Sequence, residues 1–257
     1  MPLPSFGLGD LTIDDERSFR HVAIYDKLKR VLIDDAYAFR VPVPGSPRAT
    51  WDRVVFLNLT FWSAAEPADV LVDRHIAADV VAHVAWHHLA RKAVAPAGAL
   101  SADALMFGES IASAFDLYLV GRLLGHAPDS EFLRSQVPAM SEAAEVAGLD
   151  EDAFETLLKS TADDPERAFE DLRALLFDAA TTLVHCDSVD AAADALERFD
   201  SHRFAPLLHH YALSNWVLYA RAYAPTRLAP DPLVRALDAS LRAAPVSLDW
   251  LEQRWLP

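Results

Sequence analysis

Two histidines that could share one metal ion lie in the segment 79–88. His83 and His87 are four residues apart, so on a helix both imidazoles lie on one face and can reach the same ion. This spacing alone is a weak signal, because histidine pairs on surfaces or in cores also show it without metal. A metal site therefore needs a further ligand from another part of the chain.

An apolar segment over residues 105–120 supplies such a candidate. Glu109, Ser113 and Asp116 fall within about 60° of one another on a helix, so they form one polar stripe. A helix that is apolar nearly all round is buried, and a buried carboxylate needs a charged partner, hydrogen bonds or a metal. The alternative interpretation is that the stripe is the solvent face of its helix.

These segments occur in an order that resembles the gluzincins, the thermolysin-like zinc metallopeptidases. In that family a helix with the motif His-Glu-Xaa-Xaa-His supplies two ligands, and a later helix supplies a Glu. The matching residues here are His83, His87 and Glu109, which follows His87 by 22 positions. The resemblance covers roughly residues 50–125, and it implies a zincin-like helix pair, Zn²⁺ as the cofactor and metal-assisted hydrolysis.

The sequence departs from this family at two positions that bear on catalysis. Val84 stands where the family has the Glu that activates water, and Ser113 stands at an acidic position beside the ligand Glu. Three protein ligands with an open position would still bind Zn²⁺ or another divalent ion. We therefore expect Asp79, one turn before His83, and Asp116 to act as base or to orient an imidazole.

The other histidines give weaker candidates. His88 points about 100° away from His87 on a helix, which favours a packing or surface role. His75 lies two turns before His83 and is a weaker ligand candidate. His209 and His210 could bring a third imidazole to the pair, although a polar patch without metal is the preferred interpretation of these two.

Three classes of function stay open at this stage. The first is a metal-dependent hydrolase whose substrate is an unknown small molecule or peptide. The second is a zincin-like scaffold that has lost its chemistry and serves as a binding or structural module, which Val84 favours. The third is a helical metal-dependent oxygenase or transferase that uses His209 or His210. The chain lacks a Gly-rich phosphate loop, a Gly-Xaa-Ser-Xaa-Gly elbow and a Cys-Xaa-Xaa-Cys pair, so nucleotide binding and serine hydrolysis have no support.

Composition and periodicity predict the elements that hold these residues. With 257 residues, 52% of them apolar, and only eight Gly, the chain is typical of packed helices. We expect a mainly α fold with a small β element, as one domain over 1–257 or as a zincin-like part over 1–127 and a helical part over 128–257. Strands are predicted at 38–43 and 53–61. Helices are predicted at 15–35, 67–92, 104–124 with Ser101 as N-cap, 130–147, 150–161, 165–185, 189–200, 206–222 and 230–243.

The charge and the N-terminal residues restrict partners and location. Thirty-eight acidic against 23 basic residues give a formal charge of −15, which repels nucleic acids and anionic lipids. The first 15 residues lack the basic and apolar regions of a secretory signal, and charged residues interrupt the apolar segments 70–90 and 105–124. A single cysteine, Cys186, fits a reducing compartment. These features predict a cytoplasmic protein outside the membrane, with its oligomeric state undetermined.

Overall fold

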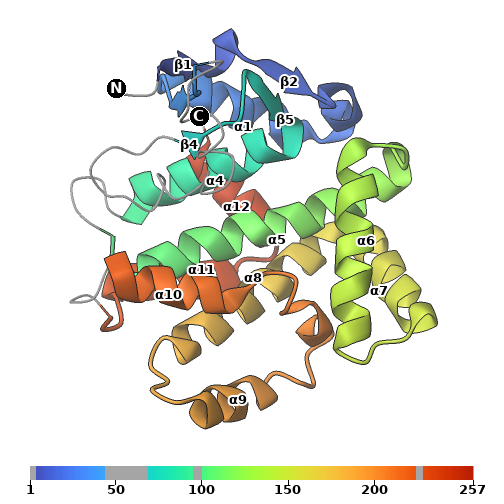
Figure 1. Cartoon of the computed structure of the whole chain (residues 1–257), viewed down its shortest axis with the longest axis vertical. Coiled ribbons are helices and arrows are strands. Elements are labelled where there is room, and N and C mark those ends of the chain that lie inside the picture. The colour runs from blue at the N-terminus through green and yellow to red at the C-terminus, as the bar shows by residue number, and fades with distance from the viewer. Residues whose placement is uncertain (1–3, 44–68, 95–99, 224–227, 257) are drawn as a thin grey trace.

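The computed structural model describes residues 4–43, 69–94, 100–223 and 228–256. Within these ranges the fold is mainly α-helical with a small β element, which confirms the predicted fold class. Short strands and a first helix precede the pair α4 (Ala78–Val94) and α5 (Ala102–His126), and further helices follow (Figure 1). The pair α4 and α5 therefore lies between the strands and the C-terminal helices.

The strands form two small sheets near the first helix. In one sheet the order is β1–β3–β4, with β1 antiparallel to β3 and β3 parallel to β4, and in the other β2 pairs in parallel with β5. The predicted strand 38–43 is confirmed in part as β3, whereas the predicted strand 53–61 lies outside the described residues. The strands are β1 (Ser5–Gly7), β2 (Thr12–Asp14), β3 (Ala38–Arg40), β4 (Asp69–Val70) and β5 (His75–Ala77).

The helix predicted over 67–92 begins only at Ala78, so the prediction was wrong for its first part. β4 and β5 occupy that part because two other strands offer backbone partners, with Phe39 opposite Asp69 and Ile13 opposite Ile76. Between β4 and β5 a turn forms at Asp73, whose side chain accepts a hydrogen bond from a backbone N–H two residues later at 2.9 Å. Residue 69 therefore belongs to a strand.

The helix predicted over 15–35 is divided into two elements. A 3-10 helix, Glu16–His21, ends at Val22, whose N–H bonds to the carbonyl of Phe19, and α1 (Ala23–Asp34) follows. The buried face of α1 includes Leu28 and Leu32, both fully buried at helical spacing. This face packs against α4 and fixes the position of that helix relative to the strands.

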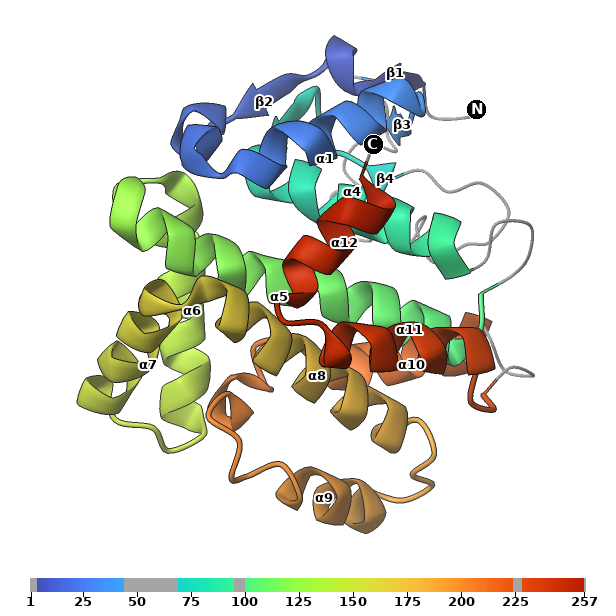
Figure 2. The ribbon, with the colours of Figure 1, turned by 180° about the vertical axis from the view of Figure 1, so that it is seen from behind.

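The helices α4 and α5 pack closely along one another (Figures 1 and 2). Ser101 caps α5 as predicted, because its hydroxyl accepts the backbone N–H three residues later at 3.1 Å. Gly108 of α5 faces Ala90 of α4, and a Cβ added at Gly108 would lie 3.4 Å from the Cβ of Ala90, at van der Waals contact. Beyond it, Trp86 of α4 packs edge-on against Phe115 of α5, with 5.5 Å between ring centroids.

Most of the predicted C-terminal helices are confirmed with small shifts at their ends. The longest of them, α8, lies along α5 on the side away from the strands (Figure 1). Asp or Ser caps each of these helices by accepting a backbone N–H of the first turn, which explains why their starts were predictable. They are α6 (Glu131–Val146), α7 (Glu151–Asp163), α8 (Pro165–Leu183), α9 (Val189–Glu197) and α11 (Pro232–Ala243).

The helix predicted over 206–222 is also wrong in its first part. A 3-10 turn, Ala205–Leu207, is followed by further turns, and α10 (Leu213–Tyr223) begins only after Ala212. Ala212 has a φ of 48°, in the left-handed region, which no residue inside an α-helix adopts. A last helix, α12 (Ser247–Trp255), was not predicted; it crosses in front of α5 in the view of Figure 2.

One cluster of buried apolar side chains draws on both halves of the chain, with members among residues 8–123 and among residues 132–256. At the centre of this cluster lies α5, which is long and apolar enough to cross a membrane by length and composition, yet 89% of its most apolar stretch is buried inside the protein.

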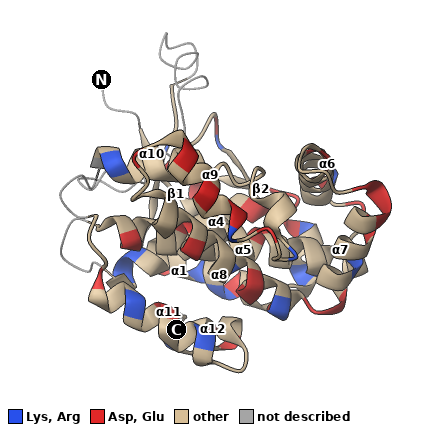
Figure 3. Ribbon diagram, turned by 90° about the horizontal axis from the view of Figure 1, so that it is seen from below, with Lys and Arg blue, Asp and Glu red and all other residues tan. Residues whose placement is uncertain are grey.

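Acidic and basic residues are interspersed along the helices, as the red Asp and Glu and the blue Lys and Arg positions in Figure 3 show. The acidic surplus is therefore distributed over several helices.

Candidate metal centre

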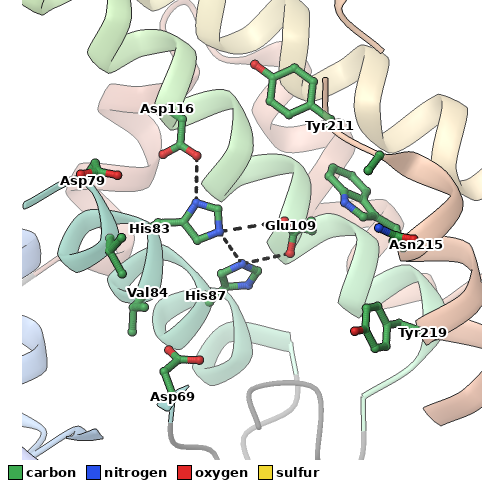
Figure 4. A pocket seen from close by; sticks show the side chains of 13 residues that line it. Asp69, Asp79, His83, Val84, His87, Glu109, Asp116, Tyr211, Asn215 and Tyr219 are labelled. Carbon is green, nitrogen blue, oxygen red and sulfur yellow. Dashed lines mark hydrogen bonds and ion pairs between the residues drawn. The ribbon is translucent and has the colours of Figure 1, made fainter. Parts of the chain in front are cut away.

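The side chains of His83, His87 and Glu109 converge on one point between α4 and α5 (Figure 4). Their ligand atoms all lie within 4.8 Å of one another. Among the described residues, these three form the group of His, Cys, Asp or Glu side chains that is close enough together to hold a metal ion. The two histidines occupy one face of α4, one turn apart, and Glu109 faces them from α5. We call these three residues the ligand cluster.

The separations within the ligand cluster lie near those expected around a tetrahedral ion. Nε2 of His87 lies 3.1 Å from Nε2 of His83 and 3.1 Å from Oε2 of Glu109. Nε2 of His83 lies 3.9 Å from Oε1 of Glu109. Ligands at about 2.0–2.1 Å from a tetrahedral Zn²⁺ are about 3.3–3.4 Å apart, so small side-chain rotations bring all three to bonding distance.

Asp116 holds the ring of His83 from the other side. Its Oδ2 lies 3.0 Å from Nδ1 of His83, so the carboxylate accepts the Nδ1 proton and leaves Nε2 facing the other two ligands. The polar stripe predicted on this helix therefore faces α4. Ser113 completes the stripe by donating a hydrogen bond to Oε1 of Glu109 at 3.3 Å, and the Glu109 side chain is only 14% exposed, so the alternative of a solvent face is wrong.

The charges of the cluster shift two pKa values in opposite directions. Burial alone lowers the pKa of His83, but the negative charges of Asp116, Glu109 and Asp69 outweigh burial and raise it to about 9. Burial alone raises the pKa of Glu109, but His87, His83 and the Ser113 hydroxyl outweigh it and lower the value. The same negative charges that hold a proton on His83 also attract a divalent cation.

Two further carboxylates, Asp69 and Asp79, line a cavity beside the ligand cluster, and both have raised pKa values. Burial raises the pKa of Asp79 to about 6, and the nearby charge of Asp116 adds to the effect. Burial also raises the pKa of Asp69 to about 6; this side chain accepts a hydrogen bond from the hydroxyl of Tyr37 at 3.3 Å. In Figure 4, Asp79 lies on the Asp116 side of the His83 ring.

A cavity of about 410 Å³ opens beside the ligand cluster. Its near wall consists of α4 and α5, and Val84 of α4 is among the residues that line it. Its far wall consists of Tyr211 and of residues from α10, including Asn215, Trp216 and Tyr219 (Figure 4). A substrate-sized space therefore adjoins the point on which the three ligands converge.

The remaining candidate residues lie elsewhere. His88 points away from the cluster, as predicted, and its Nε2 lies 2.7 Å from Oδ2 of Asp35. His75 is exposed and bonds to Asp14. His209 lines a second cavity between α9 and α10, and neither His209 nor His210 lines the cavity at the ligand cluster.

Sequence reasoning missed several residues of this cavity. Asp69 was assigned to a helix, and its place in β4 depends on strand pairing that the sequence does not display. Tyr211, Trp216 and Tyr219 lie far from the ligand cluster in the chain, and aromatic residues on an apolar helix are ordinarily core residues. The one local signal is the polar Asn215, which follows His209 and His210 closely in the sequence.

No family model, curated protein or solved structure matches this chain.

Proposed function

We propose that this protein is a metal-dependent hydrolase that binds one Zn²⁺ ion through His83, His87 and Glu109. The single observation that carries the proposal is the convergence of two Nε2 atoms and a carboxylate, at separations of 3.1–3.9 Å, beside a cavity. Two histidines with one glutamate form a donor set of catalytic zinc sites, in which an open position is left for water or substrate. The similarity to gluzincins stays part of this proposal.

Each side chain then has a role that its contacts support. Asp116 fixes the tautomer of His83 through Nδ1, which keeps Nε2 available as a ligand. When bound, the ion supplies a water of lowered pKa and polarises the bond to be cleaved. With Val84 at the family's base position, Asp69 and Asp79 are the carboxylates left to accept the proton of the attacking water, and their pKa values of about 6 suit that role near neutral pH.

Metal analysis tests the proposal directly. Protein purified without chelator is expected to carry about one Zn²⁺ per chain, and added Zn²⁺ should raise the melting temperature of the metal-free protein by linkage. His83→Ala and Glu109→Gln should each lose the bound metal. The matched control is His75→Ala, because His75 is exposed and lies outside the ligand cluster. Equal metal content in the wild type and in the cluster variants contradicts the proposal.

The second candidate is a zincin-like scaffold without chemistry, favoured by Val84 in the cavity wall. If the protein is such a scaffold, it should carry no stoichiometric metal ion, and added Zn²⁺ should leave its melting temperature unchanged. An iron-loaded protein that loses its metal on replacement of His209 or His210 would instead support the oxygenase or transferase. The same metal analysis therefore separates the three candidates.

A further inference from the structure

The cavity wall that faces the ligand cluster is aromatic. Tyr211 precedes α10, Trp216 and Tyr219 lie at helical spacing on that helix, and all three line the cavity. Figure 4 shows Tyr211 and Tyr219 across the cavity from His83. Trp216 is only 5% exposed, which means that its ring is held in place by packing. The face of an aromatic ring carries a partial negative charge and attracts cations.

The opposite wall is acidic. Asp69, Asp79, Glu109 and Asp116 all line the cavity, and neither Lys nor Arg is among its described lining residues. Two of these side chains are strongly shielded from water, since Asp69 is 3% exposed and the Glu109 side chain 14%. A divalent ion offsets only two of the four carboxylate charges, so a metal-loaded cavity keeps a net negative charge.

We infer that the substrate of this site is a small organic cation, held with its positively charged nitrogen between the carboxylates and the aromatic wall. The inference rests on the proposed function, because it names the substrate class of the same site. A volume of about 410 Å³ suits a small molecule. Aromatic faces opposed to carboxylates attract such a cation from both sides, whereas an anion would meet four like charges.

The test compares cations with uncharged molecules of the same shape. Choline is paired with its carbon isostere, in which a carbon atom replaces the nitrogen, and butylammonium is paired with butanol. The quaternary nitrogen of choline has no lone pair and the hydroxyl is shared with the isostere, so a preference for choline over the isostere cannot arise from coordination to the metal. Calorimetry on the zinc-loaded protein should give at least one cation an affinity about tenfold above that of its uncharged partner.

Two variants locate the bound cation. Asp79→Asn removes one charge at constant shape and should weaken binding of the cation at least about threefold. Tyr219→Leu removes an aromatic face and should weaken it by a similar factor. Asp129→Asn is the matched control for net charge, because the Asp129 side chain is 96% exposed and does not line the cavity. Zinc content is measured in every variant and should not change.

The outcomes separate this inference from the proposed function. If Zn²⁺ binds and neither cation exceeds its uncharged partner, the inference is overturned and the metal site stands. Equal loss of affinity in Asp79→Asn and Asp129→Asn also overturns it, since the cation would then be bound outside the cavity. If Zn²⁺ does not bind but the metal-free protein still prefers the cation and loses that preference in Asp79→Asn, the proposed function fails and the assigned ligand class is supported.

Discussion

Asp116 accepts a hydrogen bond from Nδ1 of His83, with 3.0 Å between the nitrogen and Oδ2 of the carboxylate. The bond joins α5 to α4 and determines which nitrogen of the ring faces Glu109 and His87. A histidine ligand that donates its second N–H to a carboxylate is fixed in orientation and becomes a stronger donor to the metal. Asp116 is therefore a positioning residue of the proposed metal centre.

Replacing Asp116 should weaken metal binding without abolishing it. Asp116→Asn keeps an oxygen acceptor for the Nδ1 proton but removes the negative charge, so we expect Zn²⁺ affinity to fall about 10–100-fold. Competition with a chelator of known affinity measures the change. Asp34→Asn, on the exposed end of α1, is the control and should retain the wild-type affinity. An unchanged affinity in Asp116→Asn would show that this carboxylate does not support the site.

Metal binding should be linked to proton release. Because the pKa of His83 is raised to about 9 in the metal-free protein, near neutral pH a binding ion must displace the proton from this ring. The apparent affinity should therefore fall by about tenfold for each unit of pH below that value. Calorimetry in two buffers of different ionisation enthalpy counts the protons released, and about one is expected from His83.

The same raised pKa has the opposite effect on the metal-free fold. A histidine with a folded-state pKa above its unfolded value stabilises the fold fully below about pH 6.5 and loses this contribution as the pH rises through about 9. Asp116→Asn removes the charge that contributes most to the elevation, so its proton release and this pH dependence should both decrease. Wild-type protein that binds Zn²⁺ without releasing protons near neutral pH contradicts the protonated form of His83.

Gly121 should be essential for the packing of α5, although it lies away from the ligand cluster. A Cβ at this position would lie 2.6 Å from the carbonyl oxygen of Thr161 and 3.0 Å from the Cβ of Pro165, so α7 or α8 would have to move. We expect Gly121→Ala to reduce the free energy of unfolding by about 1–3 kcal/mol in urea denaturation. The folded fraction should still bind Zn²⁺.

Gly125 supplies the matched control on the same helix. A Cβ there would meet nothing within 4 Å, and the residue is helical, so Gly125→Ala should stabilise the protein by about 0.5–1 kcal/mol. If the two substitutions change stability by similar amounts, residue 121 does not need to be glycine for close packing.

Local features of the sequence were sufficient to predict the helix pair and its ligands. His83 and His87 at helical spacing, and a Glu109 stripe on an apolar segment, are properties of single helices. The helix α5 and the part of α4 that carries the two histidines formed where the apolar periodicity indicated. The Ser101 cap was predictable for the same reason. Glu109 reaches the histidines because α5 packs against α4. This packing is not a local property of either segment, and only the resemblance to gluzincins led us to expect it.

Features that depend on distant parts of the chain were not predictable. Asp69 joins the cavity because β4 pairs with β3, about 30 residues earlier in the chain, and two-residue strands have no periodicity of their own. The start of α10 depends on the left-handed conformation of Ala212, which alanine rarely adopts and which no local signal indicates. The aromatic wall of the cavity depends on that break, since it determines how α10 faces α5.

A buried ion pair between α8 and α11 should contribute far more to stability than an exposed one. The side chain of Arg173 is fully buried, donates to Oδ1 of Asp238 at 2.8 Å and also bonds to Glu170. Removing Asp238 leaves a buried charge with an incomplete set of partners, so Asp238→Ala should lower the free energy of unfolding by about 3–5 kcal/mol. The control is Lys27→Ala, because Lys27 is half exposed in its pair with Glu252 and should change stability by less than about 1 kcal/mol. Urea denaturation of the metal-free proteins compares the two, and equal effects would mean that the Arg173 charge is compensated by groups other than Asp238.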